Sequence, residues 1–224
     1  MKMATCTESS ALHGQRMDKR HLIKTATCVI LAISAVVTAQ ESTATDWREG
    51  DIVFSGSAAS QGGAIIAATG SPYTHCGIVF LSDGKPMVLE AVQPVSVVSL
   101  ETFKSRCKPG TFRIRRLKSP LTAANYQVAR TWAAAQVGKN YDARFRWDDD
   151  ALYCSELVWK IYQHGGVELC APRRFRDYHL DDPKVRKIIE ERYGSFEKMS
   201  LDEKVVAPSD LASSPLLVDV PPES

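Results

Sequence analysis

Two short segments of the chain carry side chains that could perform nucleophilic chemistry. His75 opens a predicted strand within residues 73–79, and Cys154 opens a predicted helix within residues 153–158. A thiol at a helix N-terminus lies near unpaired backbone N–H groups and the positive end of the helix dipole; a nearby imidazolium helps to lower its pKa from about 8.5 to about 3.5–7.5. We therefore expect Cys154 to act as a thiolate nucleophile and His75 to act as its base and later as an acid.

A third group should hold the imidazole ring of His75. If residues 82–85 form the turn of a hairpin, Glu90 lies on the strand beside His75, where its carboxylate could accept the other ring N–H. The backbone N–H of Cys154 points out of the helix start and could donate to an oxyanion; the sequence does not identify a second donor. A plainer alternative stays open, because a lone cysteine on an apolar helical face is more often a small buried side chain than a nucleophile.

Short apolar stretches bounded by turns predict an antiparallel sheet that would carry the histidine and the glutamate. A turn at residues 82–85 joins two of these stretches into a hairpin, and the last stretch alternates between apolar and charged residues. The predicted strands are residues 52–54, 77–81, 87–92 and 111–117, and residues 216–220 could add an edge strand.

Three helices are predicted after the strands. The first starts at residues 119–120 and ends at Gly138, the second starts near Cys154 and ends at Gly165, and the third, residues 183–193, is charged and should lie on the surface. We expect the first helix to face the core with an apolar stripe formed by Leu121, Ala124, Val128, Trp132 and Ala135.

The N-terminal 39 residues have the pattern of a leader with a signal peptide. Residues 18–24 are basic, residues 26–37 are almost continuously apolar, and small residues precede a cut after Ala39, with Met17 as an alternative start. We expect residues 40–224 to form a single exported domain, periplasmic or secreted. The apolar run falls short of the about 20 residues that a membrane span needs, so no span is expected after cleavage, although a retained anchor is the alternative.

Composition and charge exclude several classes of protein. Of 224 residues, 44% are hydrophobic and 24% are charged, which is ordinary for a globular domain and unlike a collagenous or low-complexity chain. The formal net charge is only +2 and no block of lysine and arginine stands out, so no nucleic-acid partner is expected.

The cysteine pattern argues against a metal site. No CxxC motif and no paired histidine and cysteine spacing is present, so neither a metal ion nor another cofactor is expected. Cys107 and Cys170 could pair in a disulfide if the domain is exported. The cysteines that follow the leader are Cys76, Cys107, Cys154 and Cys170.

Several motifs, taken in order along the chain, resemble one family. They are residues 50–54, 74–79, 89–91, 141–142 and 153–158, followed by a closing segment at residues 207–211. This set resembles the YiiX/YaeF branch of the NlpC-type enzymes, which have a circularly permuted papain-like fold. The resemblance implies an α+β fold with an antiparallel sheet packed against helices. Permutation also accounts for His75 preceding Cys154, the reverse of the order in papain-like enzymes.

The resemblance assigns roles to particular residues. Cys154 matches the family nucleophile, His75 its general base and Glu90 the polar third member of a Cys-His-Glu triad. Tyr141 and Asp142 match a motif that lines the approach to the site, and Tyr73 is expected to join them in substrate binding. Cys76 stands where relatives commonly have a small or apolar residue; because strand side chains alternate, we expect it to face away from Cys154 and to serve packing.

The function that follows is an exported cysteine hydrolase, a thiol amidase or protease, that cleaves an amide through a thioester on Cys154. The resemblance implies either cell-wall peptides, such as those of peptidoglycan, or acyl amides as substrates, and the sequence does not choose between them. Two alternatives remain: an acyltransferase that uses the same site, and a non-catalytic module that binds a peptide or a lipid on the same fold.

Overall fold

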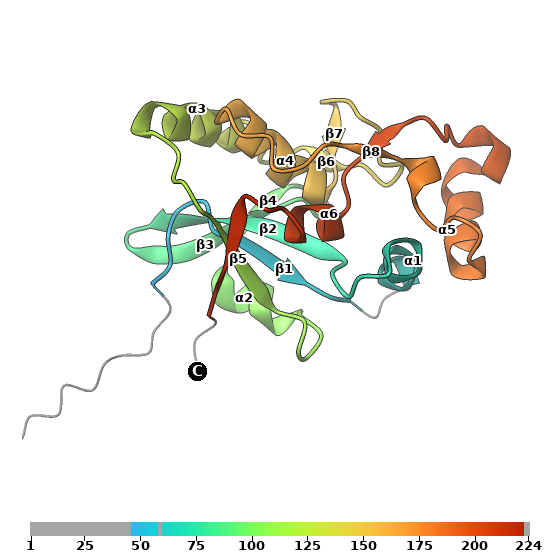
Figure 1. Ribbon diagram of the computed structural model, residues 1–224, viewed down its shortest axis with the longest axis horizontal. Coiled ribbons are helices and arrows are strands. Elements are labelled where there is room, and N and C mark those ends of the chain that lie inside the picture. The colour runs from blue at the N-terminus through green and yellow to red at the C-terminus, as the bar shows by residue number, and fades with distance from the viewer. Residues whose placement is uncertain (1–45, 58–59, 222–224) are drawn as a thin grey trace, which may run out of the picture. The chain divides into compact units, whose positions relative to one another are not determined.

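A six-stranded antiparallel sheet lies at the centre of the fold (Figure 1). The computed structural model describes residues 46–57 and 60–221 of the chain. The strand order across the sheet is β10-β5-β1-β2-β3-β4. These strands are β1 (Ile52–Ser55), β2 (His75–Ser82), β3 (Lys85–Glu90), β4 (Ser96–Ser99), β5 (Arg113–Leu117) and β10 (Leu217–Val220). Two small sheets pair β6 (Asn140–Tyr141) with β7 (Ala151–Leu152) and β8 (Arg173–Arg174) with β9 (Lys204–Val205).

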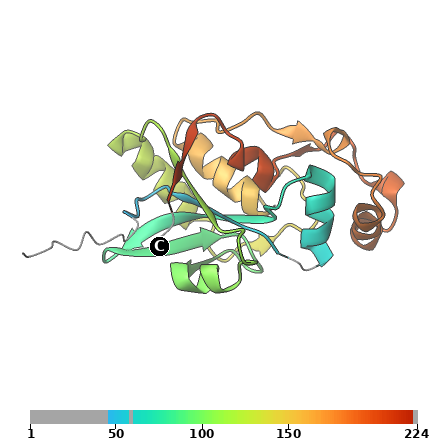
Figure 2. The same ribbon diagram turned by 60° about the horizontal axis from the view of Figure 1, so that its bottom comes forward.

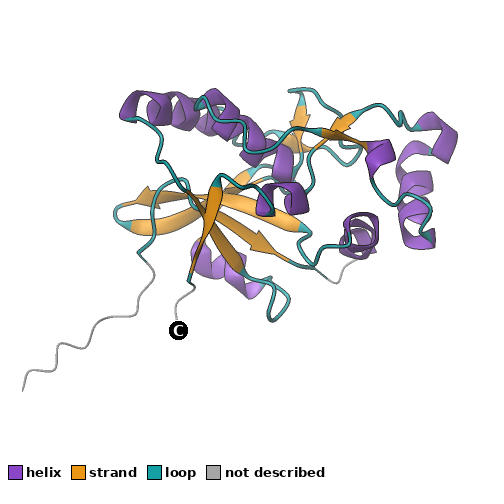
Figure 3. Cartoon of the chain, viewed as in Figure 1, coloured by secondary structure: helices purple, strands orange, loops and turns teal. Residues whose placement is uncertain are grey.

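Helices cover both faces of the central sheet (Figures 2 and 3). On one face, α4 packs on apolar side chains of β1 and β2, including Ile52 and Ile78. On the other face, Phe103 of α2 packs against Val79 and Val88. The helices are α1 (Ser60–Thr69), α2 (Leu100–Ser105), α3 (Ala123–Ala134), α4 (Cys154–His164), α5 (Pro183–Tyr193) and α6 (Pro208–Ala212), with short 3-10 turns η1 (Phe175–Asp177) and η2 (Phe196–Lys198).

The expected antiparallel sheet and its hairpin are confirmed. Ser82 pairs with Lys85, and Ile78 pairs with Leu89, so β2 and β3 form a tight hairpin in the predicted register. Gly77 is required inside this pair, because a Cβ added there would lie 2.5 Å from Cγ1 of Val88. The C-terminal segment forms the edge strand β10 beside β5, also as expected.

Buried charged groups fix the sheet to the segments at its edges. The carboxylate of Asp51, which has no exposed surface, accepts two hydrogen bonds from the Arg116 guanidinium at 2.6 and 2.7 Å. The guanidinium of Arg115 donates to the backbone carbonyls of Ala212 and Leu217, both at 2.8 Å. These charge-assisted bonds connect the sheet to the chain that precedes β1 and to the segment that leads into β10.

The expected core stripe of α3 is confirmed at Leu121 and Trp132, which pack against the core, and wrong at Ala124, Val128 and Ala135, which are exposed. The side chain of Val128 is 53% exposed. Ala129 and Ala133 are buried instead, in the core cluster that also contains residues of α4. The helix also begins later than predicted, at Ala123, with Thr122 as its N-cap. Because this segment is rich in alanine, its apolar residues do not define a single stripe, and the small side chains of Ala129 and Ala133 are the ones buried in the core cluster shared with α4.

Helix α5 is more than the charged surface helix that its sequence predicts. Val185 and Ile189 are buried and pack against Ala64 of α1. The sequence patterns do not predict α1, nor do they predict α2, α6 and β4. The pairing of α1 with α5 builds a separate apolar cluster beside the sheet.

The four described cysteines are free, so the suggested disulfide between Cys107 and Cys170 is absent. The two residues border different core clusters on opposite faces of the sheet. The predicted leader, with its cut after Ala39 and its alternative start at Met17, lies outside the described residues, and the single domain of residues 40–224 stays a prediction. Within the described part of the chain, every helix is too short or too polar to cross a bilayer.

Candidate active site

Cys154 is the first residue of α4 and is held in place by the residues on either side of it. The hydroxyl of Ser155 donates to the carbonyl of Val206 at 2.6 Å, and the backbone N–H of Val206 donates to the hydroxyl of Tyr153 at 3.2 Å. Cys154 itself is 4% exposed. Its sulfur therefore lies at a helix N-terminus whose position is fixed by buried hydrogen bonds.

His75, the first residue of β2, is clamped between a carboxylate and an aromatic ring. Its Nε2 lies 2.6 Å from Oε2 of Glu90. The imidazole stacks on Phe103 with ring centroids 5.7 Å apart and an interplanar angle of 23°. His75 and Cys154 lie close enough to shift each other's pKa, and since Nε2 faces Glu90, Nδ1 is the ring nitrogen left for the sulfur.

Glu90 has a second partner that the sequence did not indicate. Its carboxylate has no exposed surface, and Oε1 accepts a hydrogen bond from Nη2 of Arg106 at 2.5 Å. Burial alone would raise the pKa of Glu90, but the hydrogen bonds and charges of His75 and Arg106 lower it below its ordinary value. Glu90 is thus held as a carboxylate, and Arg106, which follows the last residue of α2, completes the arrangement.

Cys76 is fully buried in the core, as the packing role predicted for it requires, but it lies beside Cys154 instead of facing away from it, which corrects that part of the prediction. Side-chain alternation is preserved, since Cys76 points to the face of the sheet opposite His75; that face is the one on which α4 packs. Its side chain and its backbone N–H both act to lower the pKa of Cys154. Burial and the proximity of Cys154 raise the pKa of Cys76, so Cys76 stays a thiol and donates its proton to the neighbouring sulfur.

The contacts of Cys154 favour its thiolate form. The hydrogen bond from Cys76 lowers the pKa of Cys154; burial opposes this, and the hydrogen bond and charge of His75 reinforce it, so that the pKa falls well below its ordinary value. Burial by itself would lower the pKa of His75, but hydrogen bonds and charges of Cys154 and Glu90 raise it to about 9. Both shifts favour a thiolate and imidazolium pair over two neutral side chains.

The acidic residues near α4 oppose this thiolate less than their number indicates. Burial raises the pKa of Glu156 to about 8, and its Oε1 lies 2.8 Å from Nζ of Lys160. Asp149 also pairs with Lys160, at 2.8 Å. The positive end of the helix therefore acts on Cys154 with little competition from these carboxyl groups.

Tyr141 lies on the wall of a cavity that also includes Cys154. Its backbone N–H donates to Oε1 of Gln93 at 2.6 Å, and β6 pairs with β7 just before α4. These contacts hold Tyr141 between the end of β3 and the start of α4. Its hydroxyl accepts a hydrogen bond from Nε2 of Gln61 at 2.9 Å, which leaves its own proton free to donate.

The other two residues expected to bind substrate lie elsewhere. The buried carboxylate of Asp142 accepts backbone N–H groups of Arg144 at 2.8 Å and Arg146 at 2.5 Å, so it shapes its own loop. The ring of Tyr73 packs between Phe54, at 5.7 Å between centroids, and the Arg113 guanidinium. Among the described residues that line the cavity, Tyr141 is present and these two are not.

No group of three or more His, Cys, Asp and Glu side chains in the described ranges has the arrangement of a metal site. The ionisable groups around Cys154 interact with one another.

A cysteine at the start of a helix, packed on an antiparallel sheet that supplies a histidine and a carboxylate earlier in the chain, defines a permuted papain-like architecture. Residues 46–220 match the family model described as permuted papain-like amidase enzyme, YaeF/YiiX, C92 family. The chain therefore belongs to this family, and the expected α+β permuted papain-like fold is confirmed.

Two relatives from Escherichia coli support the assignment. The chain is 36% identical to the uncharacterized protein YiiX of strain K12 over 177 residues, which cover 79% of this chain and 87% of that protein. It is also similar to the crystal structure of a protein from Escherichia coli O157:H7, described as metalloprotein yiiX, with a TM-score of 0.73 and 36% identity; the match covers 79% of this chain and 97% of that one.

Proposed function

We propose that this protein is an exported thiol amidase that cleaves its substrate through a thioester on Cys154. The observation that carries the proposal is the position of His75 between Glu90, at 2.6 Å from Nε2, and the sulfur of Cys154. A thiolate is the reactive form of cysteine, and an imidazolium beside it can supply the proton that an amine leaving group needs.

In the proposed reaction the Cys154 thiolate attacks the amide carbonyl carbon and forms a tetrahedral oxyanion. Collapse of this intermediate breaks the C–N bond, and His75 gives its proton to the departing nitrogen, so that the amine leaves neutral. The neutral imidazole then removes a proton from water. The hydroxide formed attacks the thioester and releases the carboxylic acid, and Cys154 leaves again as the thiolate beside a protonated His75. Glu90 keeps the ring oriented through both steps.

Two donors are available for the oxyanion. The backbone N–H of Cys154 lies in the first turn of α4, where it has no partner within the helix. The hydroxyl of Tyr141 accepts from Gln61 and keeps its own proton to donate. We assign these two groups to the oxyanion hole.

Export is proposed from the basic and apolar segments within the N-terminal 39 residues. Removal of this leader after Ala39 would release the domain to the periplasm or the exterior, where both cell-wall peptides and acyl amides occur. Intact mass of the protein recovered from the extracytoplasmic fraction tests this part separately.

The thioester is the intermediate to trap. The mature protein is incubated with peptidoglycan fragments and with N-acyl amino acids, quenched in acid, and analysed by intact mass and peptide mapping. We expect an acyl adduct on Cys154 and release of the amine, both lost in Cys154→Ala and both kept in the matched variant Cys107→Ala. Cleavage that persists in Cys154→Ala would refute the mechanism. Binding of either substrate without cleavage or adduct would instead favour a non-catalytic binding module.

Acyl transfer is a second candidate because Cys154 is only 4% exposed, which limits the access of water to a thioester. Adding hydroxylamine or a primary alcohol during turnover distinguishes the two activities. An acyltransferase would pass most of the acyl group to the added acceptor, whereas a hydrolase would release mainly the free acid.

A further inference from the structure

Cys76 is a buried thiol beside the nucleophile, and it forms no bond in the proposed amidase reaction. It has no exposed surface, and Cys154 is 4% exposed. Both residues belong to the same core cluster. A second thiol next to a reactive one gives this site a chemistry that amide cleavage does not use.

The way α4 lies along β2 brings the two sulfurs together. Cys76 and Ile78 point to the face of the sheet on which α4 packs. Farther along both elements, Ile78 of β2 and Ile161 of α4 line the same second pocket, so α4 follows β2 from its first residues onward. Cys154, the first residue of α4, thus lies beside Cys76, and both the side chain and the backbone N–H of Cys76 act on it.

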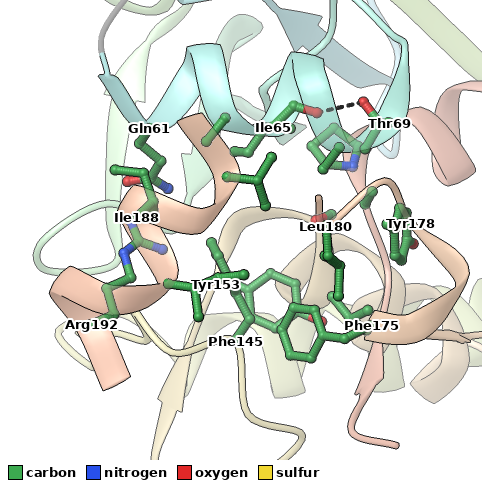
Figure 4. Close-up of a pocket in the computed structure, with 18 of the residues that line it drawn as sticks. Gln61, Ile65, Thr69, Phe145, Tyr153, Phe175, Tyr178, Leu180, Ile188 and Arg192 are labelled. Atoms are coloured by element: carbon green, nitrogen blue, oxygen red, sulfur yellow. Dashed lines mark hydrogen bonds between the residues drawn. The ribbon is translucent and has the colours of Figure 1, made fainter. Parts of the chain in front are cut away.

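The cavity gives access to one sulfur of the pair. It extends between α1 and α5, and Figure 4 shows side chains of both helices, such as Ile65 and Ile188, pointing into it. It has an empty volume of about 800 Å³, counted to its open mouth. Cys154 belongs to its wall, whereas Cys76 is not among the described residues that line it. A small dissolved molecule therefore meets Cys154 first.

The protonation states of the two side chains divide their roles. The contacts of Cys154 favour its thiolate, which is the form of cysteine that peroxides oxidise. Burial raises the pKa of Cys76, and the negative charge of Cys154 raises it further. Oxidation of Cys154 to a neutral sulfenic acid removes that charge. One cause that holds Cys76 as a thiol is therefore lost when a second nucleophile is needed.

We infer that Cys76 and Cys154 form a disulfide when the site meets a peroxide, and that this bond inactivates the enzyme reversibly. Cys154 is the sulfur that is oxidised first, and Cys76 is the sulfur that resolves it. Both are free thiols in the structure described above, which represents the reduced and active state. The inference goes beyond the amidase reaction and does not depend on which amide is cleaved.

Two steps account for all atoms and electrons. The Cys154 thiolate attacks one oxygen of hydrogen peroxide; the S–O bond forms, the O–O bond breaks, and the departing hydroxide takes the proton of His75 and leaves as water. The sulfur of Cys76 then attacks the sulfenic sulfur; the S–S bond forms, the S–O bond breaks, and hydroxide leaves with the Cys76 proton as a second water. The two sulfurs together lose two electrons, which the peroxide takes up.

The disulfide preserves the nucleophile while it blocks it. A sulfenic acid without a neighbouring thiol is oxidised further to sulfinic and sulfonic acids, which thiol reductants do not reverse, whereas a disulfide is reduced back to two thiols. An exported protein also lies outside the thioredoxin and glutathione pools that keep cytosolic thiols reduced. A resolving cysteine beside the nucleophile therefore has a use in the location proposed for this protein.

Peptide mapping without reduction tests the inference. Trypsin leaves Cys76 on residues 49–104 and Cys154 on residues 147–160, apart from Cys107 and Cys170. The folded protein is treated with hydrogen peroxide, blocked with N-ethylmaleimide and digested. We expect a peptide that joins these two segments, a matching loss of iodoacetamide labelling at Cys154, and return of the labelling after dithiothreitol.

The matched control for this experiment is Cys107→Ala, which should form the same joined peptide to the same extent. Oxidation of Cys154 in the native protein to a sulfinic acid, with no joined peptide, would overturn the inference.

Cys76→Ser supplies the second measurement, because it removes the resolving sulfur and keeps a donor beside Cys154. After short exposure to peroxide, dimedone should trap a sulfenic acid on Cys154 in this variant. After prolonged exposure to excess peroxide, dithiothreitol should restore nearly all labelling in the native protein and almost none in Cys76→Ser, with circular dichroism confirming that both were folded beforehand. Equal recovery in the two proteins would contradict the inference.

Amide turnover by the same samples keeps this inference separate from the amidase. A joined peptide in a protein that cleaves no amide in its reduced form would refute the proposed function and support the disulfide. If the reduced protein cleaves amides and peroxide stops cleavage without a joined peptide, the disulfide is refuted and the amidase remains.

Discussion

The cluster around Cys154 and the cavity between α1 and α5 adjoin each other, but the first consists of polar and charged side chains and the second mainly of apolar ones. In the cluster, a sulfur, an imidazole, a buried carboxylate and a guanidinium contact one another in sequence. In the cavity, most lining groups are hydrocarbon, and the hydroxyl groups of Thr69 and Ser155 donate to backbone carbonyls of the protein.

The two regions should therefore have different roles, the cluster in the chemical step and the cavity in substrate binding. The cluster residues come from β2 and β3, which are strands of the central sheet, and from α4 and the end of α2, which pack on that sheet. Cavity residues come largely from α1, α5 and their flanking segments, which pack on each other beside the sheet. Substitutions in the cluster should therefore change the rate of the chemical step, and substitutions in the cavity should change which substrate binds.

His75→Gln should give the largest separation. Removing the imidazole takes away both the proton donor and the group that stabilises the thiolate, so we expect kcat to fall by about 10⁴-fold. The affinity for the amide substrate, measured by titration in the background of Cys154→Ala, should change less than twofold, because His75 is not among the described residues that line the cavity. A parallel loss of binding and rate would show that the two regions are one.

Tyr141→Phe should have the next largest effect, because Tyr141 belongs to both regions. An oxyanion donor acts in the transition state, so kcat should fall by about 10²- to 10³-fold with KM nearly unchanged. Gln61→Leu, which removes the hydrogen bond to Tyr141 without removing its proton, should cost less. If KM rises and kcat does not change, Tyr141 serves the cavity instead of the reaction.

Cys76→Ala should have the smallest effect and acts on the pH dependence. With the native pair, alkylation of Cys154 by iodoacetamide should vary little between pH 6 and pH 8, and turnover should decline as pH rises through about 9, where His75 loses its proton. Removing the Cys76 donor should raise the pKa of Cys154 and lower its thiolate fraction, so that labelling at pH 6 slows by about tenfold.

Cys76→Ser, which keeps an O–H donor, should restore part of the labelling rate, and Cys107→Ala is the matched control. Identical pH profiles for Cys76→Ala and the native protein would remove Cys76 from the site.

The positions of His75 and Glu90 could be predicted because a tight hairpin fixes its own register. Once the turn at residues 82–85 is recognised, pairing places Glu90 opposite Gly77 and diagonal to His75 on the same face. The start of α4 was similarly predictable from Cys154 and the apolar spacing that follows it. Local sequence carries both kinds of information, since neither depends on how distant segments pack.

Cys76, Arg106 and the cavity could not be predicted for the opposite reason. The alternation of β2 correctly puts Cys76 and His75 on opposite faces, but the sulfur of Cys154 reaches both at the end of the strand. Arg106 reaches Glu90 only because α2 packs on the other face of the sheet. The cavity depends on α1, an alanine- and glycine-rich segment without a marked apolar stripe, and on the tertiary pairing of α5 with it.

The thiolate of Cys154 owes its existence to side chains that neighbour it only after the chain has collapsed. Before that, the sulfur is an ordinary, weakly reactive thiol, since its partners on β2 are far away along the polypeptide. Folding and the onset of alkylation should thus coincide, and a rapid pulse of iodoacetamide during refolding would time the closure of the sheet onto α4 without any spectroscopic label.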